Sequence, residues 1–293
     1  MSRRRGRPLA GEPRSPLEAL VARIDAASEG APSPDTIPTG FASIDRVIGG
    51  GLRRHDLSVV AGDVGSGKSA LALGIALRAA AARTPTVLLT GEASADRVLE
   101  RALALEGRAS VDELRLGRLG DTARASVGAA AVRLRGLPLS VRPLEGHDFG
   151  EIAAALDSVP RPALLVVDSL QLAGPPRPAV RLDDRVALAA RALKALAVTR
   201  DVAVLATAQL PRHRAGRADP RPALDDLGSN GAVKQQADLV LGIYREEMYR
   251  AGQGVEGATE LIVLKNRNGP TGFVDLFFYK QWLRFEDMLD PEP

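Results

Sequence analysis

One short run of residues combines glycines, a lysine and a hydroxyl in a spacing that suits phosphate chemistry. After an apolar stretch at 57–61 the chain reads Gly62-Asp63-Val64-Gly65-Ser66-Gly67-Lys68-Ser69, and an alanine- and leucine-rich sequence starts at Ala70. Glycines here let successive backbone N–H groups point inward around an anion, and a helix N-terminus adds the positive end of its dipole. Lys68 would reach the β- and γ-phosphates of a nucleotide, and the Ser69 hydroxyl would hold Mg²⁺. We therefore predict that residues 62–70 form a nucleoside triphosphate site.

Three polar side chains come at the ends of apolar, strand-like runs. They are Glu92, Asp168 and Gln209. If these runs are parallel strands, their carboxyl ends meet at the sheet edge where the phosphates bind. Asp168 is then placed to bind Mg²⁺ through water, Glu92 to polarise an attacking water, and Gln209 to sense the γ-phosphate. For Glu92 and Gln209, position alone leaves a solvated loop acid and an ordinary polar strand end equally open.

The elements that would position these groups alternate along the chain. We expect strands at 57–61, 86–90, 139–142, 163–168, 202–206 and 239–244, and helices near 68–82, 94–106, 121–135, 149–157 and 184–199. This alternation indicates an α/β fold whose mainly parallel, twisted sheet is covered by helices on both faces. Strand-like runs at 260–265 and 273–279 around an Asn-Gly-Pro turn predict a C-terminal β-hairpin.

The N-terminal part differs from this core. Residues 1–14 are rich in arginine, proline and glycine, and we expect a disordered basic tail there. Residues 15–36 are expected to form a linker helix and a linker. Ser15 as N-cap, Pro16 at the first helical position and Glu18 three residues after the cap are a helix start signal. The apolar stripe of this helix is Leu17, Leu20, Val21 and Ile24. A detached stripe requires a partner, either its own core or a neighbouring subunit. We expect the core domain to span 37–288 and a short tail to follow at 289–293.

The amino-acid composition argues against several other kinds of site. Hydrophobic residues make up 45% of the 293 residues, which is enough for a large core, and the net charge is only +3. The absence of cysteine and the three scattered histidines argue against disulfides and a transition-metal site. No apolar run approaches a membrane span and the N-terminus lacks a signal-peptide core, so we expect a cytoplasmic protein without a membrane partner. Lysine is used at only five positions, which singles out Lys68 and Lys265 as places that arginine does not fill.

Taken together, the motifs resemble the C-terminal motor domain of bacterial replicative helicases of the DnaB family, within the RecA-like hexameric ATPases. The resemblance covers roughly residues 35–288. Besides the phosphate loop it rests on IPTGF at 37–41 with ID at 44–45, EASA at 92–95, LVVDSLQL at 165–172, LKALA at 193–197, AQL at 208–210, the sequence 231–238, and above all KNRNGPTG at 265–272. The resemblance implies a RecA-like P-loop NTPase core, ATP and Mg²⁺ as cofactors, and a homo-oligomer in the form of a hexameric ring.

Roles for individual residues follow from the resemblance. It implies that Glu92 activates water, that Gln209 senses the nucleotide, and that Lys265 and Arg267 reach into the ATP site of the neighbouring subunit. Two cations two residues apart on a strand point to the same side, and a cation supplied in trans stabilises charge developing on phosphates. A solvated basic hairpin tip is the alternative.

The resemblance also implies a path for single-stranded DNA, along the loops that follow the Asp168 and Gln209 strands and line a central channel in this family. The candidate contacts are Arg177, Arg181, Arg185, Arg212, Arg214, Arg217, Arg221, Gly231 and Lys234. Arginines and glycine N–H groups suit phosphates and give salt-sensitive binding without sequence preference. In a chain this rich in arginine, solvated loops are the alternative.

Several positions depart from the family pattern. The phosphate loop has Gly-Ser-Gly-Lys-Ser where replicative members commonly have Ser-Met-Gly-Lys-Thr. Positions 228–231 read GSNG in place of Arg-Glu-Ser-Gly, and 234–236 read KQQ in place of Glu-Gln-Asp, which makes this region more basic. We also expect the helical N-terminal collar domain to be absent, with only something like its linker helix at 16–26.

The favoured interpretation is an ATP-dependent DNA helicase or translocase motor that acts on single-stranded DNA as a ring, with a helicase loader as a further partner. One alternative is a RecA-like ATPase of the RadA/Sms or KaiC type, which remodels DNA or regulates without replicative unwinding. The missing Cys₄ zinc motif and the single ATPase core argue against it. A second alternative is a non-catalytic protein that joins helicase rings, although all catalytic positions are filled.

Overall fold

The computed structural model describes residues 15–29, 33, 35–144, 149–174, 181–210, 217–228, 231–250, 252 and 254–288. The chain divides into two compact units, Met1–Thr36 and Ile37–Pro293. The first unit contains helix α1 (Pro16–Ser28), which begins with the predicted capping box. The Glu18 amide donates to Ser15 Oγ at 3.2 Å, and the Ser15 amide donates to Glu18 Oε2 at 2.9 Å. The predicted apolar stripe of α1 is exposed.

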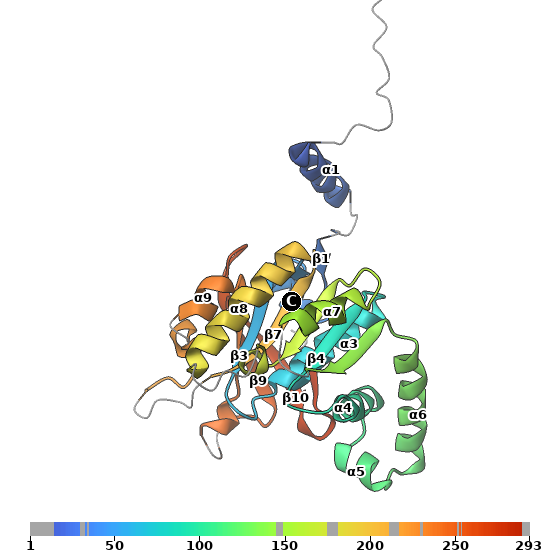
Figure 1. The fold of residues 1–293 in the computed structure, drawn as a ribbon. Helices are drawn as coiled ribbons and strands as arrows, with labels where there is room; N and C mark the ends of the chain where they lie inside the picture. The colour runs from blue at the N-terminus through green and yellow to red at the C-terminus, as the bar shows by residue number, and fades with distance from the viewer. Residues whose placement is uncertain are drawn as a thin grey trace, which may run out of the picture. The chain divides into compact units, whose positions relative to one another are not determined.

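The second unit is built on a nine-stranded sheet of order β11-β10-β9-β8-β3-β7-β6-β4-β5 (Figure 1). Its strands are β3 (Leu57–Gly62), β4 (Thr86–Thr90), β5 (Leu139–Pro143), β6 (Leu164–Asp168), β7 (Ala203–Gln209), β8 (Leu239–Tyr244), β9 (Ala258–Asn266), β10 (Gly272–Tyr279) and β11 (Arg284–Asp287). The six strands from β8 to β5 pair in parallel, and β9, β10 and β11 continue the sheet in antiparallel pairs. The predicted mainly parallel sheet with a C-terminal hairpin is confirmed.

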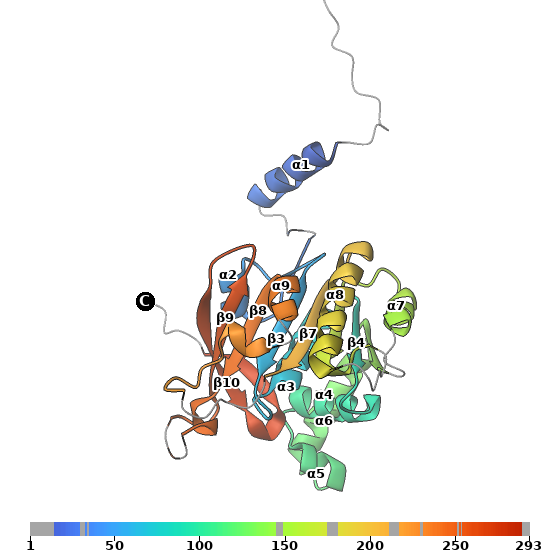
Figure 2. The ribbon, with the colours of Figure 1, turned by 60° about the vertical axis from the view of Figure 1, so that its left-hand side comes forward.

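Helices cover both faces of this sheet, as predicted (Figure 2). The helices are α2 (Ala42–Ile48), α3 (Lys68–Ala81), α4 (Ala95–Gly107), α5 (Val111–Leu116), α6 (Asp121–Arg135), α7 (Phe149–Asp157), α8 (Leu182–Thr199) and α9 (Ala232–Gln236). Side chains alternate between the two faces of each strand. Thus Val60 of β3 packs in the core under α2, α3 and α4, and Val59 packs in the core under α7, α8 and α9.

The helices and strands that were not predicted from the sequence include β1 (Thr36–Ile37), β2 (Leu52–Arg53), α5, α9 and β11. All of these are short, and β11 is defined by its pairing with β10, which places Phe285 opposite Phe278. None of the helices in the described ranges is long and apolar enough to cross a membrane.

Candidate active site

The phosphate loop lies between β3 and α3, where a buried strand passes directly into a helix. Gly65 and Gly67 adopt φ values of 79° and 103°, which favour glycine. A Cβ on Gly67 would come within 2.7 Å of the Phe285 ring, so the position is closed to larger residues. Gly67 is the N-cap of α3 without a side-chain capping bond, so the first N–H groups of the helix are left for a ligand. Within the described chain the buried Ser66 hydroxyl also lacks a partner.

The predicted metal residues meet beside this loop. Ser69 Oγ donates to Asp168 Oδ1 at 3.0 Å, across 99 residues of sequence. Thr207, on the neighbouring strand β7, donates to the same carboxylate oxygen at 2.5 Å. A hydroxyl and a carboxylate held together are ligands that Mg²⁺ prefers. The residues present therefore fit a Mg²⁺–nucleotide complex, with Ser69 and Asp168 toward the metal and the loop toward the phosphates. Thr207 was missed in the sequence because its orienting role depends on strand order.

Lys68 lies in the middle of these groups and is a desolvated cation. Its Nζ donates to the Asp63 carbonyl at 2.8 Å. Burial lowers the pKa of Lys68, and the negative charges of Glu92, Asp168 and Asp63 oppose that shift. A phosphate group would pair directly with this cation. Lys68 therefore suits a phosphate ligand, and the surrounding carboxylates suit a Mg²⁺ ion that accompanies it.

Glu92 and Gln209 are exposed at the same edge of the sheet. Glu92 sits in the turn after β4, and Thr90 Oγ1 pins that turn by donating to the Ala93 carbonyl and accepting from its amide, at 3.0 and 3.2 Å. Gln209 is the last residue of β7, next to Gly62 of the phosphate-loop strand. The geometry thus brings both side chains to the carboxyl end of the sheet. Their roles toward a nucleotide remain predictions.

A further contact that the sequence did not indicate supports the loop from β8. The buried Arg245 donates through Nη1 to the Gly65 carbonyl at 3.1 Å. Its guanidinium also pairs with Glu247 and lies 4.8 Å from the centre of the Phe278 ring. Because Gly65 and Arg245 are 180 residues apart, no local sequence signal marks this contact.

Lys265 and Arg267 lie at the other end of the sheet. Strand β9 is antiparallel to β8, so its last residue, Asn266, pairs with the first residue of β8, Leu239. Lys265 Nζ donates to the Lys234 carbonyl at 2.6 Å and to the Ala237 carbonyl. Burial and the adjacent Arg267 lower the pKa of Lys265. The two cations and the chain's own phosphate loop are therefore at opposite ends of β3.

The predicted DNA contacts are distributed over described and undescribed segments. Arg177, Arg212 and Arg214 lie outside the described residues. Arg217 pairs with Asp226 at 2.6 Å, and Lys234 pairs with Asp225 at 2.5 Å. Arg181 is the N-cap of α8, and Gly231, with a φ of 75°, is the N-cap of α9. Arg221 donates from Nε and Nη2 to the Glu260 carboxylate at 2.7 and 2.6 Å. Arg185 is also among the described candidates. None of these contacts tests DNA binding.

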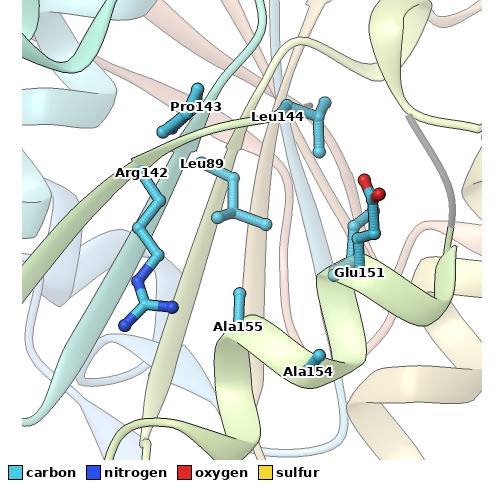
Figure 3. Close-up of a pocket in the computed structure, with 8 residues that line it drawn as sticks. Leu89, Arg142, Pro143, Leu144, Glu151, Ala154 and Ala155 are labelled. Carbon is cyan, nitrogen blue, oxygen red and sulfur yellow. The ribbon is translucent and has the colours of Figure 1, made fainter. Parts of the chain in front are cut away.

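A separate cavity of about 410 Å³ lies between β5 and α7 (Figure 3). Its lining includes Leu89, Leu144 and Ala155, and Arg142 and Glu151 flank it from the strand and the helix. Leu89 belongs to the core under α7 and α8, whereas the helix that follows the phosphate loop covers the opposite face. The cavity therefore lies apart from the nucleotide site.

A phosphate loop between β3 and α3, with an acid two strands away on a mainly parallel sheet, defines a P-loop NTPase with a RecA-like core. The family model described as DnaB-like helicase C terminal domain matches residues 36–287, and the chain belongs to this family.

Individual relatives agree with that assignment. The chain is 33% identical over 257 residues to the replicative DNA helicase DnaB of Geobacillus stearothermophilus, which covers 86% of this chain and 56% of that protein. It is 32% identical over 277 residues to the DnaB of Leifsonia xyli subsp. xyli, covering 93% of this chain and 60% of the relative. The chain therefore spans less than two thirds of the length of these curated relatives.

Solved structures share the fold. The ATPase domain of G40P superimposes with a TM-score of 0.85 at 26% identity, covering 95% of this chain and all of that domain. A DnaB-like replicative helicase, whose structure concerns its interactions with primase, gives a TM-score of 0.84 at 24% identity and covers 95% of this chain. The second likeness bears on the fold alone.

Proposed function

We propose that this chain is the motor of an ATP-driven DNA helicase, which hydrolyses Mg²⁺–ATP and moves along single-stranded DNA as a ring of six identical subunits. The observation that carries the proposal is the convergence of Lys68, Ser69 and Asp168 on one cradle in a member of the DnaB-like family. The family match favours this motor over the RadA/Sms or KaiC type of ATPase.

In the proposed reaction the loop N–H groups and Lys68 bind the β- and γ-phosphates. Ser69 and Asp168 would hold Mg²⁺, which would neutralise phosphate charge. Glu92 accepts a proton from the water that attacks the γ-phosphorus, while the bond from that phosphorus to the β–γ bridging oxygen breaks and ADP leaves with this oxygen. Gln209 contacts the γ-phosphate at the end of β7. The fixed turn around Thr90 supports this role, because a general base must be held within reach of its water.

The proposal of a ring is supported by the distance between the phosphate loop and the cations Lys265 and Arg267, which lie at opposite ends of β3. Six strand residues of β3 span about 20 Å, at about 3.3 Å per residue, so Lys265 and Arg267 cannot reach the phosphates bound by their own chain. In a head-to-tail ring the same cations can face the phosphates of the next subunit. The exposed apolar stripe of α1 is a second feature for which a neighbouring subunit would supply a partner.

For DNA, we propose that the loops after β6 and β7 carry the contacts. The described ion pairs Arg217–Asp226 and Lys234–Asp225 are near the surface, where solvent and salt screen such pairs and they contribute little to stability. A nucleic-acid phosphate can therefore replace either carboxylate at small cost. Binding of this kind would depend on salt and not on base sequence.

The test is the ATPase rate with and without single-stranded DNA, measured with the native mass of the same sample. We expect a ring mass, a basal rate and stimulation by single-stranded DNA, with Lys68→Ala as the inactive control. A monomer that hydrolyses ATP at a rate indifferent to DNA would contradict the proposal.

A further inference from the structure

Asp238 is a buried carboxylate at the entrance of β8, and its side chain is only 3% exposed. Oδ2 accepts from the Leu57 amide at 2.9 Å and from Lys194 Nζ at 2.6 Å. Oδ1 accepts from Arg267 Nη1 at 2.9 Å. One carboxylate thus contacts the first residue of the phosphate-loop strand, helix α8 and the C-terminal hairpin. No catalytic step proposed above uses it.

The pairing around Asp238 keeps its second oxygen available to Arg267. Lys194 is held from three sides, because its Nζ also donates to the His55 carbonyl at 2.7 Å and approaches Asp56 Oδ1 at 3.4 Å. Asp56 in turn accepts from Asn268 of the hairpin at 2.8 Å. Burial and the nearby Asp238 charge raise the pKa of Asp56. A buried carboxylate persists only when it is paired in this way.

Arg267 is fixed at both ends by this arrangement. Its amide donates to the Asp238 carbonyl at 2.8 Å, and its Nη1 and Nη2 donate to Asp238 Oδ1 and to the Gln235 carbonyl at 2.9 and 3.0 Å. The side chain is nevertheless 52% exposed. A guanidinium has five N–H donors, so several remain for an external acceptor. The arginine is held in place without being hidden.

The cluster as a whole keeps an excess of positive charge. Lys194, Lys265 and Arg267 face two carboxylates, Asp56 and Asp238, and Lys265 is held by carbonyl oxygens. Such an arrangement positions cations while leaving a field that attracts an anion.

We propose that Asp238 is the positioning residue for Arg267, and that Lys194 holds Asp238 for this purpose. The inference rests on the proposed action of Arg267 at the nucleotide of a neighbouring subunit. A flexible arginine must otherwise be ordered each time it meets the transition state, and misplacing a catalytic group by about 1 Å costs about 100-fold in rate. Asp238 therefore acts on the turnover of the next subunit and not on nucleotide binding by its own.

The test is a double-mutant cycle of Asp238→Asn and Arg267→Ala in the full chain, measured on assembled rings. The isosteric amide keeps one acceptor oxygen but turns an N–H₂ group toward a cation. We expect Asp238→Asn to lower kcat about 10- to 100-fold, with affinity for a fluorescent ATP analogue within about threefold of wild type. The double variant should be no slower than Arg267→Ala alone, because Asp238 acts only through that arginine.

Asp157→Asn is the matched control. Asp157 also receives an arginine fork, from Arg200 at 2.7 and 3.2 Å, but on an exposed surface and outside the described contacts of Asp238 and Arg267. It should leave kcat and affinity unchanged. If Asp238→Asn does not fold, Asp238→Asn/Lys194→Met removes both charges of the buried pair and should fold with the same loss of kcat.

The outcomes separate this inference from the proposal beneath it. Wild-type turnover by Arg267→Ala would overturn the trans role of Arg267 and the inference with it. A strongly impaired Arg267→Ala together with normal kcat for both Asp238 variants would overturn the positioning role alone. So would a double variant whose residual turnover is lower than that of Arg267→Ala by the factor that Asp238→Asn alone costs. If Asp238→Asn binds the ATP analogue more weakly and also melts at a lower temperature than wild type, in step with its loss of kcat, Asp238 has a structural role only.

Discussion

The two ends of strand β3 carry charged clusters that are built differently. At the carboxyl end the groups surround space for a ligand: the described contacts leave the Ser66 hydroxyl unpaired, and Lys68 is desolvated with acids nearby. At the amino end Lys194, Lys265 and Arg267 bond to carbonyl and carboxylate oxygens of their own chain. The first cluster is a cradle completed by a nucleotide. The second has its charges paired within the chain and exposes Arg267, as half of a shared site would.

The largest expected effect separates binding from turnover at the cradle. Lys68→Ala should abolish hydrolysis and weaken nucleotide binding, because Lys68 contacts phosphates already in the ground state. Glu92→Gln should keep nucleotide affinity while turnover falls about 10²- to 10⁴-fold, since a general base acts only on the attacking water. Equilibrium binding and steady-state ATPase measure the two quantities. Near-normal turnover by Glu92→Gln would contradict the role of Glu92 as the general base.

An intermediate effect is expected where DNA is proposed to bind. Changing Arg212, Arg214 and Arg217 together to alanine should weaken single-stranded DNA binding and reduce the salt slope by about 2, at about 0.7 per phosphate contact. Basal ATPase should stay unchanged, because none of the three arginines is proposed to bind nucleotide.

The matched control changes Arg108, Arg115 and Arg118, three exposed arginines around α5. It alters net charge equally and should leave the salt slope as in wild type. Equal slopes for the two triple variants would move the DNA path elsewhere.

The smallest expected effect concerns the stability of the empty cradle. Burial lowers the pKa of Lys68, so the unfolded chain binds this proton more tightly than the folded one, and the charge destabilises the folded protein at neutral pH. Without nucleotide, Lys68→Met should therefore melt higher than wild type at pH 7. The difference should shrink as pH rises through the lowered pKa toward the ordinary lysine value. Mg²⁺–ATP should reverse the order. A variant that melts lower without nucleotide contradicts this account of Lys68.

Local signals in the sequence were sufficient for much of the cradle. A glycine-rich turn between an apolar strand and an alanine-rich helix depends on residues adjacent in the chain, and α6 and α7 were predicted with the ends observed. The Ser15–Glu18 capping box was predicted for the same reason. Asp168 required only that its strand be parallel to β3, which strand–helix alternation indicates.

The opposite cluster could not be predicted in this way. Asp238 gains its partners from positions 29, 44 and 181 residues away, and those distances depend on the strand order of the sheet. Lys194 was noted as one of five lysines, but the residues next to it in the sequence do not indicate which oxygen atoms accept its hydrogen bonds. Strand β11 was missed because four residues, of which only Phe285 is buried, carry little signal without their neighbour β10.

Mixing two inactive variants tests the shared site most directly. Arg267→Ala should form rings that bind ATP but keep only a small residual turnover, and Lys68→Ala rings should be inactive because their own phosphate loops lack the lysine. In mixed rings some interfaces pair an intact Lys68 with an intact Arg267, so we expect ATPase activity to return, with a maximum near equal amounts of the two proteins. Subunit exchange is followed separately by native mass with one variant labelled. If exchange is complete and the mixture stays as inactive as either variant alone, the two ends of β3 do not meet across subunits.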